Sequence, residues 1–290
     1  MLEVKNIKKN FGGLIAVNDA SMLVKKGSIT EFLPISSSGH LILVPKLTGW
    51  PDQGLLIDVA LHVGTLLAVV LYLWKDILRI TGALFRSLGV ISTRRSSKPE
   101  ILLISKLAIA TIPIIIAGYA MNKYLGNTFR SFEVIGWTTL SFALLLFLAD
   151  KINMTIRRMD HITFGGAFFI GLFQVLALIP GTSRAGITIT ATRFLGVERQ
   201  DTARFSLLLS IPVIFAAGTL KGFHLYSSGN VVLFQDAITS VAISFGFAII
   251  SIALLMAWLR RATFTPFVIY RIILGVGLLF IAYWMPNFSL

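Results

Sequence analysis

The stretch TEFLPISSSGH, residues 30–40, places a carboxylate, three serines and a histidine around one proline. The rest of the chain is so apolar that this polar cluster needs a reason to be there. Of the 290 residues, 56% are hydrophobic and 13% are charged, whereas soluble domains carry roughly 25% charged residues. With a mean hydropathy of +0.82, the composition predicts an all-α integral membrane protein.

Apolar runs along the chain predict about six transmembrane helices, because a helix needs ~20 apolar residues to cross a bilayer. The runs are 55–73, 101–121, 134–149, 206–222, 237–259 and 267–284. The net charge of +13 does not call for a nucleic acid, because the basic residues gather in alternate short loops. By the positive-inside rule these loops are cytoplasmic, and the segment 224–236, without Lys or Arg, is external.

One apolar run, 164–179, is too short to span, and it ends in PGTSRAG at 180–186. A second apolar stretch follows at once. If this piece crossed the membrane, the arginines after it would face outside. A re-entrant hairpin keeps them cytoplasmic, so we expect one here. Non-helical backbone is tolerated at membrane depth where protein or a wet cavity surrounds it.

The opening stretch has the same pattern as this hairpin. FLPISSSGHLILV and LIPGTSRAGITIT both run from apolar residues through Pro, small hydroxyl residues and Gly into an apolar half-helix. Three expected spans follow each of them. We therefore predict two re-entrant helical hairpins in an inverted-topology repeat. The first repeat covers about 30–150 and the second about 160–290.

The broken helix ends predict an anion site. A helix start has free backbone N–H groups, and two starts that face each other favour negative charge. A guanidinium adds a fork of donors that suits phosphate oxygens. The polar residues of the two motifs are Glu31, Ser36, Ser37, His40, Thr182, Ser183 and Arg184. This set fits a phosphorylated ligand with a metal ion or a proton transfer beside it.

Five of these residues also have a purely structural interpretation. Glu31 could be a wet carboxylate in a shallow hairpin, and Arg184 its counter-ion. His40 could be a packing residue, and Ser36 or Ser37 a helix cap. Intramembrane ionisable groups favour the functional interpretation.

Four further polar residues lie in or near the expected spans. Asp58 and His62 lie four apart and can hydrogen-bond, which suggests an orienting or packing pair. For Arg271 the expectation is snorkelling or a contact with a carbonyl. Gln174 is expected to line the second hairpin.

With TEFLPISSSGH and ALIPGTSRAG together, the chain resembles the undecaprenyl-diphosphatase family, also called bacitracin-resistance proteins. DVALHVGTLLAVVLYLWKD and RFSLLLSIPVI support the resemblance, which runs from about Thr30 to the C-terminus. It implies hydrolysis of a polyprenyl diphosphate to the monophosphate, which recycles the lipid carrier of cell-wall synthesis. It also implies a multi-pass protein of the bacterial inner membrane with its active site toward the outer face.

The resemblance further implies roles for the site residues. The catalytic group is Glu31, Ser37, His40 and Arg184, and the substrate-binding group is Ser36, Thr182, Ser183 and Arg184. A divalent cation is implied at Glu31, with Mg²⁺ expected and Ca²⁺ as the alternative. Attack by Ser37 and attack by water both stay open, as does a homodimer.

The chain departs from the family at its N-terminus. Family members carry a second Glu four residues before the one matching Glu31, and here that position is Gly27. Residues 1–29 alternate like paired strands and resemble the opening of an ABC transporter ATPase subunit. The phosphate-binding loop of such an ATPase does not follow. We interpret 1–29 as a segment foreign to the family, strand-like or disordered, joined to a membrane diphosphatase domain at 30–290.

Two rival functions follow from this departure and from the fold. The chain could be an inactive or weakly active relative, because one carboxylate is lost. It could also be a transporter or flippase for the same lipid, since inverted repeats are common in transporters. Release of phosphate in detergent separates an enzyme from both.

The predicted topology can be tested by thiol labelling, because the chain contains no cysteine. Single cysteines at Ser228 and Ser96 should differ in intact cells. A membrane-impermeant reagent should label position 228, in the external segment, and should miss position 96, in a basic loop. Labelling at 96 alone would invert the topology.

Overall fold

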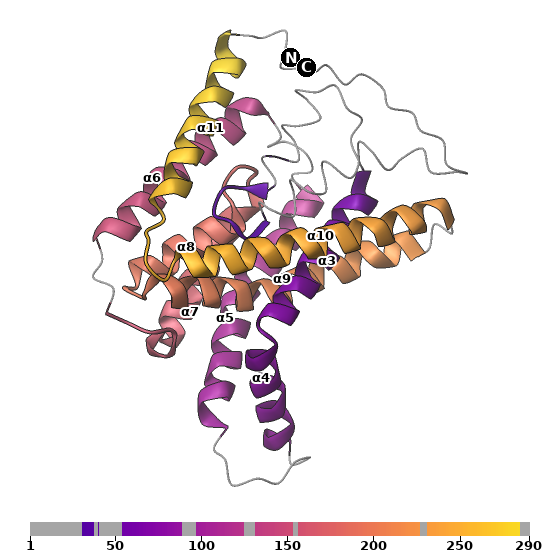
Figure 1. The fold of residues 1–290 in the computed structure, drawn as a ribbon, viewed down its shortest axis with the longest axis vertical. Helices are drawn as coiled ribbons and strands as arrows, with labels where there is room; N and C mark the ends of the chain where they lie inside the picture. Colours follow the sequence, from indigo (N-terminus) through magenta and orange to yellow (C-terminus); the bar gives the residue numbers. More distant parts are fainter. Residues whose placement is uncertain are drawn as a thin grey trace.

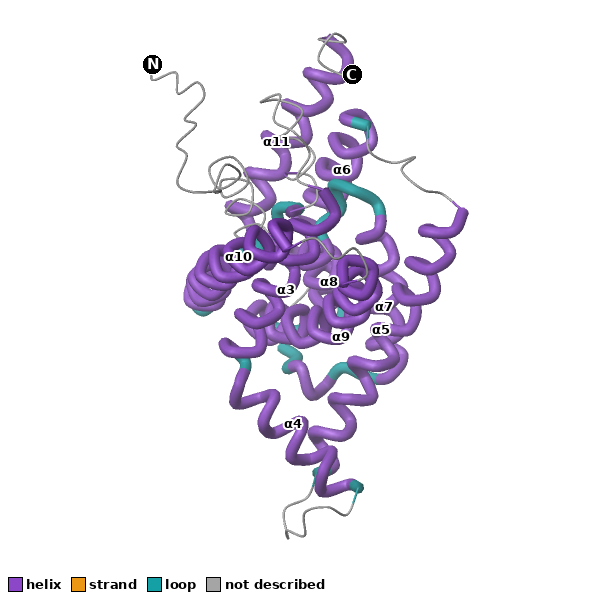
Figure 2. The backbone as a smooth tube through the Cα atoms, turned by 90° about the vertical axis from the view of Figure 1, so that its right-hand side faces the viewer, coloured by secondary structure: helices purple, strands orange, loops and turns teal. Residues whose placement is uncertain are grey.

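The computed structural model describes residues 31–37, 40, 54–88, 97–124, 131–152, 156–226 and 231–284. Within these ranges the chain is helical and forms no strand beyond one isolated bridge, which confirms the all-α prediction (Figures 1 and 2). The segment 1–29, with its expected strands, lies outside the described residues.

The helices follow one another with short connections. They are α3 (Gly54–Tyr72), α4 (Trp74–Ser87), α5 (Lys98–Tyr124), α6 (Phe132–Ile152), α7 (Phe164–Val175), α8 (Arg184–Phe194), α9 (Arg199–Tyr226), α10 (Val231–Trp258) and α11 (Thr265–Trp284), with 3-10 turns at Met159–His161 and Leu176–Leu178.

Four helices of the described part are long and apolar enough to cross a membrane: Lys98–Met121, Phe132–Ile152, Ile238–Trp258 and Thr265–Trp284. They match four of the six predicted spans. The predicted span at 55–73 is α3, which meets α4 at a bend of 82°. The span at 206–222 lies inside α9. The multi-pass fold is confirmed, while the total of six stays a prediction.

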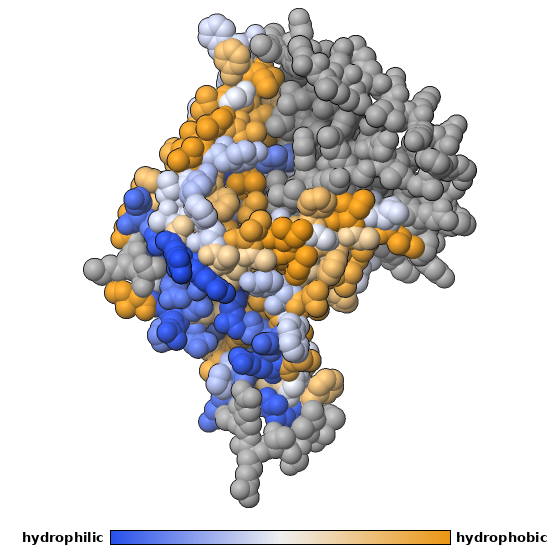
Figure 3. Space-filling view, viewed as in Figure 1, coloured by the Kyte–Doolittle hydropathy of each residue, from blue (hydrophilic) through white to orange (hydrophobic). Residues whose placement is uncertain are grey.

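Large apolar side chains cover the outside of these helices. Ile116 is 64% exposed, Leu254 66% and Ile273 67%. Figure 3 shows this hydrophobic surface over the upper part of the molecule, with hydrophilic residues gathered at the lower left. So much exposed apolar surface would be unfavourable in water, and the bilayer is the solvent that accommodates it.

The second hairpin consists of α7, the 3-10 turn Leu176–Leu178 and α8. Its two ends meet: Arg157 N donates to Gly196 O (3.1 Å), and Glu198 N donates to Arg157 O (2.8 Å). The chain therefore returns to the place where the hairpin began. This is the path that a re-entrant hairpin requires, although its depth in a membrane stays a prediction.

Helix α8 is buried along its whole length from Ala185 to Arg193. Three of its residues are threonines, which usually need partners when buried. Each donates to a carbonyl four residues back: Thr188 to Arg184 (2.9 Å), Thr190 to Gly186 (2.7 Å) and Thr192 to Thr188 (2.7 Å). The helix thus satisfies its own hydroxyl groups and can lie inside the bundle.

Helix pairing agrees with an inverted repeat. Exchange of the two repeats interchanges α3 with α9, α5 with α10 and α6 with α11. The contacts α3–α9 and α6–α11 then map onto themselves, and α3–α10 maps onto α9–α5; all of these pairs are in contact. Glycines allow two of the approaches, since a Cβ at Gly64 would lie 2.4 Å from Val241 O and one at Gly275 would lie 3.1 Å from Gly136 O. The boundaries of the repeats and of the domains stay predictions.

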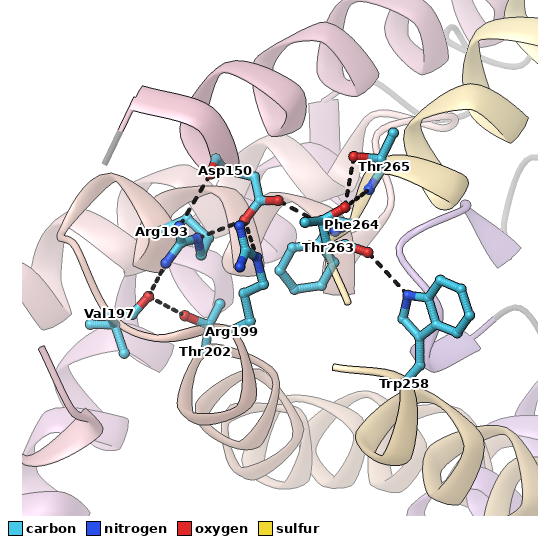
Figure 4. A network of polar contacts seen from close by, with 9 residues as sticks. All are labelled: Asp150, Arg193, Val197, Arg199, Thr202, Trp258, Thr263, Phe264 and Thr265. Atoms are coloured by element: carbon cyan, nitrogen blue, oxygen red, sulfur yellow. Dashed lines mark hydrogen bonds and ion pairs between the residues drawn. The ribbon is translucent and has the colours of Figure 1, made fainter. Parts of the chain in front are cut away.

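A buried ion network joins α6, α8, α9 and the start of α11 (Figure 4). Asp150 Oδ1 accepts from Arg193 Nε (3.0 Å) and Arg199 Nε (2.8 Å), and Arg193 also donates to Val197 O. The Arg193 side chain is 0% exposed and that of Asp150 4%. This carboxylate therefore holds the base of the second hairpin.

We predict that Asp150→Ala strongly destabilises the fold. Loss of the carboxylate leaves the Arg193 charge buried without its counter-ion, which costs about 3–5 kcal/mol. The thermal midpoint in detergent should fall well below that of the control Asp160→Ala, whose side chain is exposed. Equal midpoints in the two variants would contradict this role for the network.

Candidate functional site

The second broken helix turns at Gly181 and Ser183, which have φ values of 93° and 69°. Glycine is required at 181, because a Cβ there would lie 2.2 Å from Thr138 Oγ1. Thr138 and Thr139 of α6 donate to the carbonyls of Pro180 (2.7 Å) and Gly181 (3.2 Å). The turn is thus fixed from α6.

Ser183 starts helix α8. Its Oγ accepts a hydrogen bond from Gly186 N (3.1 Å), and Ile187 N donates to its carbonyl (2.9 Å). The hydroxyl is therefore the N-cap of α8. Arg184 is the first residue of the helix, so its side chain leaves from the positive end of the helix dipole.

The first broken helix repeats this local structure. Ser36 has a φ of 71° and stands three residues before Gly39, as Ser183 stands three before Gly186. His40 N lies 3.4 Å from Ser36 O, which is the bond that Ile187 N makes in the second turn. Only Ser183 and Ser36 are non-glycine residues with positive φ in the described part. The sequence likeness of the two motifs is therefore also a structural one.

The two helix starts meet at Glu31. Its Oε2 accepts from Ser37 Oγ at 2.5 Å, and its Oε1 accepts from Arg184 Nη2 at 3.0 Å. By the correspondence of the turns, Ser37 and Arg184 occupy equivalent positions after Ser36 and Ser183. The Glu31 side chain is 6% exposed and that of Arg184 13%. A hydroxyl, a carboxylate and a guanidinium from the two motifs thus share one nearly dry place, while their roles as site residues stay a prediction.

His40 faces the last helix. Its Nδ1 lies 2.6 Å from Ser36 O and its Nε2 lies 2.6 Å from the hydroxyl of Tyr270. A carbonyl can only accept, so Nδ1 carries a proton, and in the neutral ring Nε2 accepts from Tyr270. The two rings stack with centroids 5.7 Å apart. His40 is therefore oriented by α11.

Arg271, the next residue of α11, is fully buried. Its Nη1 donates to Pro34 O (3.4 Å), and its Nη2 donates to Gly181 O (3.2 Å) and Thr182 O (2.9 Å). Of the two expectations for Arg271, the contact with carbonyls is confirmed. Snorkelling is wrong, because the side chain is buried between the turn at Pro34 and the turn at Gly181.

The remaining predicted residues lie around this centre. Ser36 and Thr182 are fully buried, and Thr182 Oγ1 has no hydrogen-bond partner among the described residues. Gln174 is buried in the second hairpin and donates to Ala110 O (3.2 Å). His62 is half-buried on α3, while the side chain of Asp58 lies outside the described part, so their pairing stays a prediction.

Sequence reasoning missed Tyr270, Thr138 and Thr139. They lie in α6 and α11, far along the chain from both motifs, and single polar residues in apolar spans carry no motif. One signal in the sequence could have pointed to Tyr270. Tyr270 precedes Arg271, and an intramembrane Arg defaults to a functional hypothesis together with its neighbours.

The described residues do not by themselves fit a resident metal ion. Among the residues that the structure describes at the turns, Glu31 is the one carboxylate, and both of its oxygens already accept hydrogen bonds. In the described ranges no group of three or more His, Cys, Asp or Glu side chains could hold a metal. No step below therefore runs through a metal.

Comparison with known proteins identifies the family. Residues 27–277 match the model of the bacitracin resistance protein BacA. Curated relatives named undecaprenyl-diphosphatase are 47% identical in Roseobacter denitrificans and 48% identical in Ruegeria pomeroyi, each covering 88% of this chain and 94% of the relative. A relative of that name in Campylobacter curvus is 48% identical over 87% of this chain and 94% of its own. The chain therefore belongs to the bacitracin resistance protein BacA family.

Proposed function

We propose that this membrane protein hydrolyses undecaprenyl diphosphate to undecaprenyl monophosphate and phosphate, and so recycles the lipid carrier of cell-wall synthesis and confers bacitracin resistance. The observation that carries the proposal is the meeting of Ser37, Glu31 and Arg184 at two helix starts. Such a place binds a concentrated negative charge and holds an oxygen nucleophile beside a base.

In the first step, the Ser37 oxygen attacks the terminal phosphorus, and the bond from this phosphorus to the bridging oxygen breaks. Glu31, at 2.5 Å from Ser37 Oγ, takes the serine proton and passes it to an oxygen of the leaving monophosphate. Arg184 and the positive end of the α8 helix dipole hold the phosphate oxygens and stabilise their growing charge. The 2.5 Å contact favours Ser37 over a direct attack by water.

In the second step, water attacks the phosphorus of the phosphoserine, the bond from this phosphorus to Ser37 Oγ breaks, and phosphate leaves. The proton that the water loses is returned to the Ser37 oxygen. The pair of His40 and Tyr270 takes up the proton of the water. In the neutral ring, Nε2 of His40 accepts a hydrogen bond from the Tyr270 hydroxyl at 2.6 Å, so Tyr270 can pass its own proton to His40 as it takes one from the water.

Location and partners follow the same proposal. The substrate is a lipid, and the exposed apolar helices place the protein in the bilayer with it. We place the site toward the outer face of the bacterial inner membrane, because the second hairpin opens from the basic, cytoplasmic side and its tip reaches away from it. A divalent cation, Mg²⁺ or Ca²⁺, stays a prediction for which the diphosphate itself would supply most of the oxygen ligands.

We predict that the chain is a weak enzyme as it stands, because Gly27 stands where the family has a carboxylate and the sequence before Thr30 does not have the pattern of an apolar half-helix. Gly27→Glu alone should raise the rate only modestly. Replacement of residues 1–29 by an apolar half-helix ending in Glu-x-x-x should raise it about a hundredfold, since a shift of ~1 Å at Glu31 can cost that much. The measurement is phosphate release in detergent, with Mg²⁺ and with EDTA. Equal rates in the three forms would make the first Glu dispensable.

We predict that Ser37→Ala lowers the turnover number at least about a hundredfold, because it removes the nucleophile. The test uses whichever of these forms turns over the lipid, with Ser87→Ala, an exposed serine, as control. Acid-quenched enzyme should retain label from a substrate labelled at the terminal phosphate. Activity in the Ser37→Ala variant with no retained label in the parent would assign the attack to water instead.

We predict that Arg184→Lys loses most of the activity, about tenfold or more, because an ammonium cannot make the forked contact with phosphate oxygens. Arg260→Lys, at an exposed arginine, is the matched control and should keep the parent rate. The measurement is phosphate release at several substrate concentrations. Near-normal turnover of the Arg184→Lys variant would remove this residue from the site.

A further inference from the structure

Arg271 links the two halves of the site through main-chain groups. It reaches Pro34 O of the first turn at 3.4 Å and Gly181 O and Thr182 O of the second turn at 3.2 and 2.9 Å. These carbonyls come just before Ser36 and Ser183, the two serines with positive φ. One side chain from α11 therefore holds both unusual turns at once, and with them the distance between Ser37 and Arg184.

The guanidinium also brings a charge that the described residues do not balance. In the described part no carboxylate forms a salt bridge with Arg271, and its Nε has no hydrogen-bond partner. Main-chain carbonyls offset only part of the cost of burying a cation. Among the described residues of the two turns and their partners, Arg271, Arg184 and Glu31 supply two guanidinium groups and one carboxylate. The surplus favours an anionic ligand.

The close fit around Arg271 has a counterpart in Gly186. A Cβ at position 186 would lie 2.7 Å from Arg271 Nη1 and 3.2 Å from Ser183 Oγ. Gly186 lies in the first turn of α8, next to the N-cap. A methyl group there would displace the guanidinium without removing its charge.

We propose that Arg271 is a positioning residue of the site: it sets the two hairpin turns against each other and places a second buried positive charge beneath the bound diphosphate. The role rests on the proposed function for its substrate. Arg271 acts through the backbone of the turns, whereas Arg184 offers its side chain to the ligand directly.

Three substitutions distinguish the effect of where the Arg271 guanidinium lies from the effect of its charge. Arg271→Lys keeps the charge and loses the reach to both turns, and Arg271→Met loses both. Gly186→Ala keeps the charge and displaces it. Gly277→Ala is the control, because it lies on the same helix and a Cβ there meets nothing within 4 Å. Each variant is assayed in detergent for the turnover number per folded molecule and for the affinity of inorganic pyrophosphate, which is measured as the rise in the thermal midpoint.

In Arg271→Lys and Gly186→Ala the turnover number should fall about tenfold or more, because the catalytic groups move apart. Their affinity for pyrophosphate should stay within about threefold, because the charge remains. In Arg271→Met the affinity should also fall about tenfold or more. The control should match the parent in both measurements.

A merely structural residue would give a different result. The midpoints of the variants would then fall, while the turnover and pyrophosphate affinity of the folded fraction stayed at the parent values, and this outcome would overturn the proposal. If Arg271→Met does not fold, the turnover numbers of Arg271→Lys and Gly186→Ala decide between a positioning role and a merely structural one. Binding of pyrophosphate without turnover, both in the parent and in the form with the rebuilt N-terminus, would refute the proposed hydrolysis. The pyrophosphate affinity of Arg271→Met would then decide the role of Arg271 in the anion site, and an unchanged affinity would overturn it.

Discussion

The buried contact between Glu31 and Arg184 is the constraint on which the site depends. The two residues lie at different breaks in the chain, 153 positions apart, and their 3.0 Å salt bridge forms only if these two breaks meet. A carboxylate in so dry a place is costly unless it is paired. The pairing therefore specifies how the two halves of the protein must fit together. The second carboxylate oxygen accepts a hydrogen bond from Ser37. Glu31 therefore holds the two halves of the protein together and also contacts the proposed nucleophile.

The surrounding helices serve this meeting of two turns. Helix α6 fixes the second turn through Thr138 and Thr139, and α11 holds both turns through Arg271. Helices α6 and α11 in turn approach closely at Gly136 and Gly275. Backbone in an irregular conformation survives inside a membrane protein only where such partners satisfy its polar groups. The apolar helices thus hold the two polar turns in place inside the protein.

Much of this arrangement follows from the sequence, because local patterns carry it. The apolar runs predicted four of the helices that can span, and the two Pro and hydroxyl motifs predicted the breaks and the meeting of Glu31, Ser37 and Arg184. The partners of His40 and of the turn carbonyls could not be found this way. Tyr270 and Thr138 act through tertiary contacts, and nothing in the spacing of an apolar helix shows which neighbour it will have. The bend between α3 and α4 is likewise a consequence of packing, without a proline or glycine at Leu73 to announce it.

The closed base of the second hairpin has a consequence for how such a protein can change. Because the backbone of Arg157 is hydrogen-bonded to Gly196 O and Glu198 N, on either side of Val197, the loop that enters the bundle leaves it at its own starting point. The sequence of the hairpin between Arg157 and Val197 can therefore change without a change in the connections to the neighbouring helices. Such a hairpin can be replaced as a unit, and different residues at its tip could alter the chemistry while the rest of the backbone keeps its course.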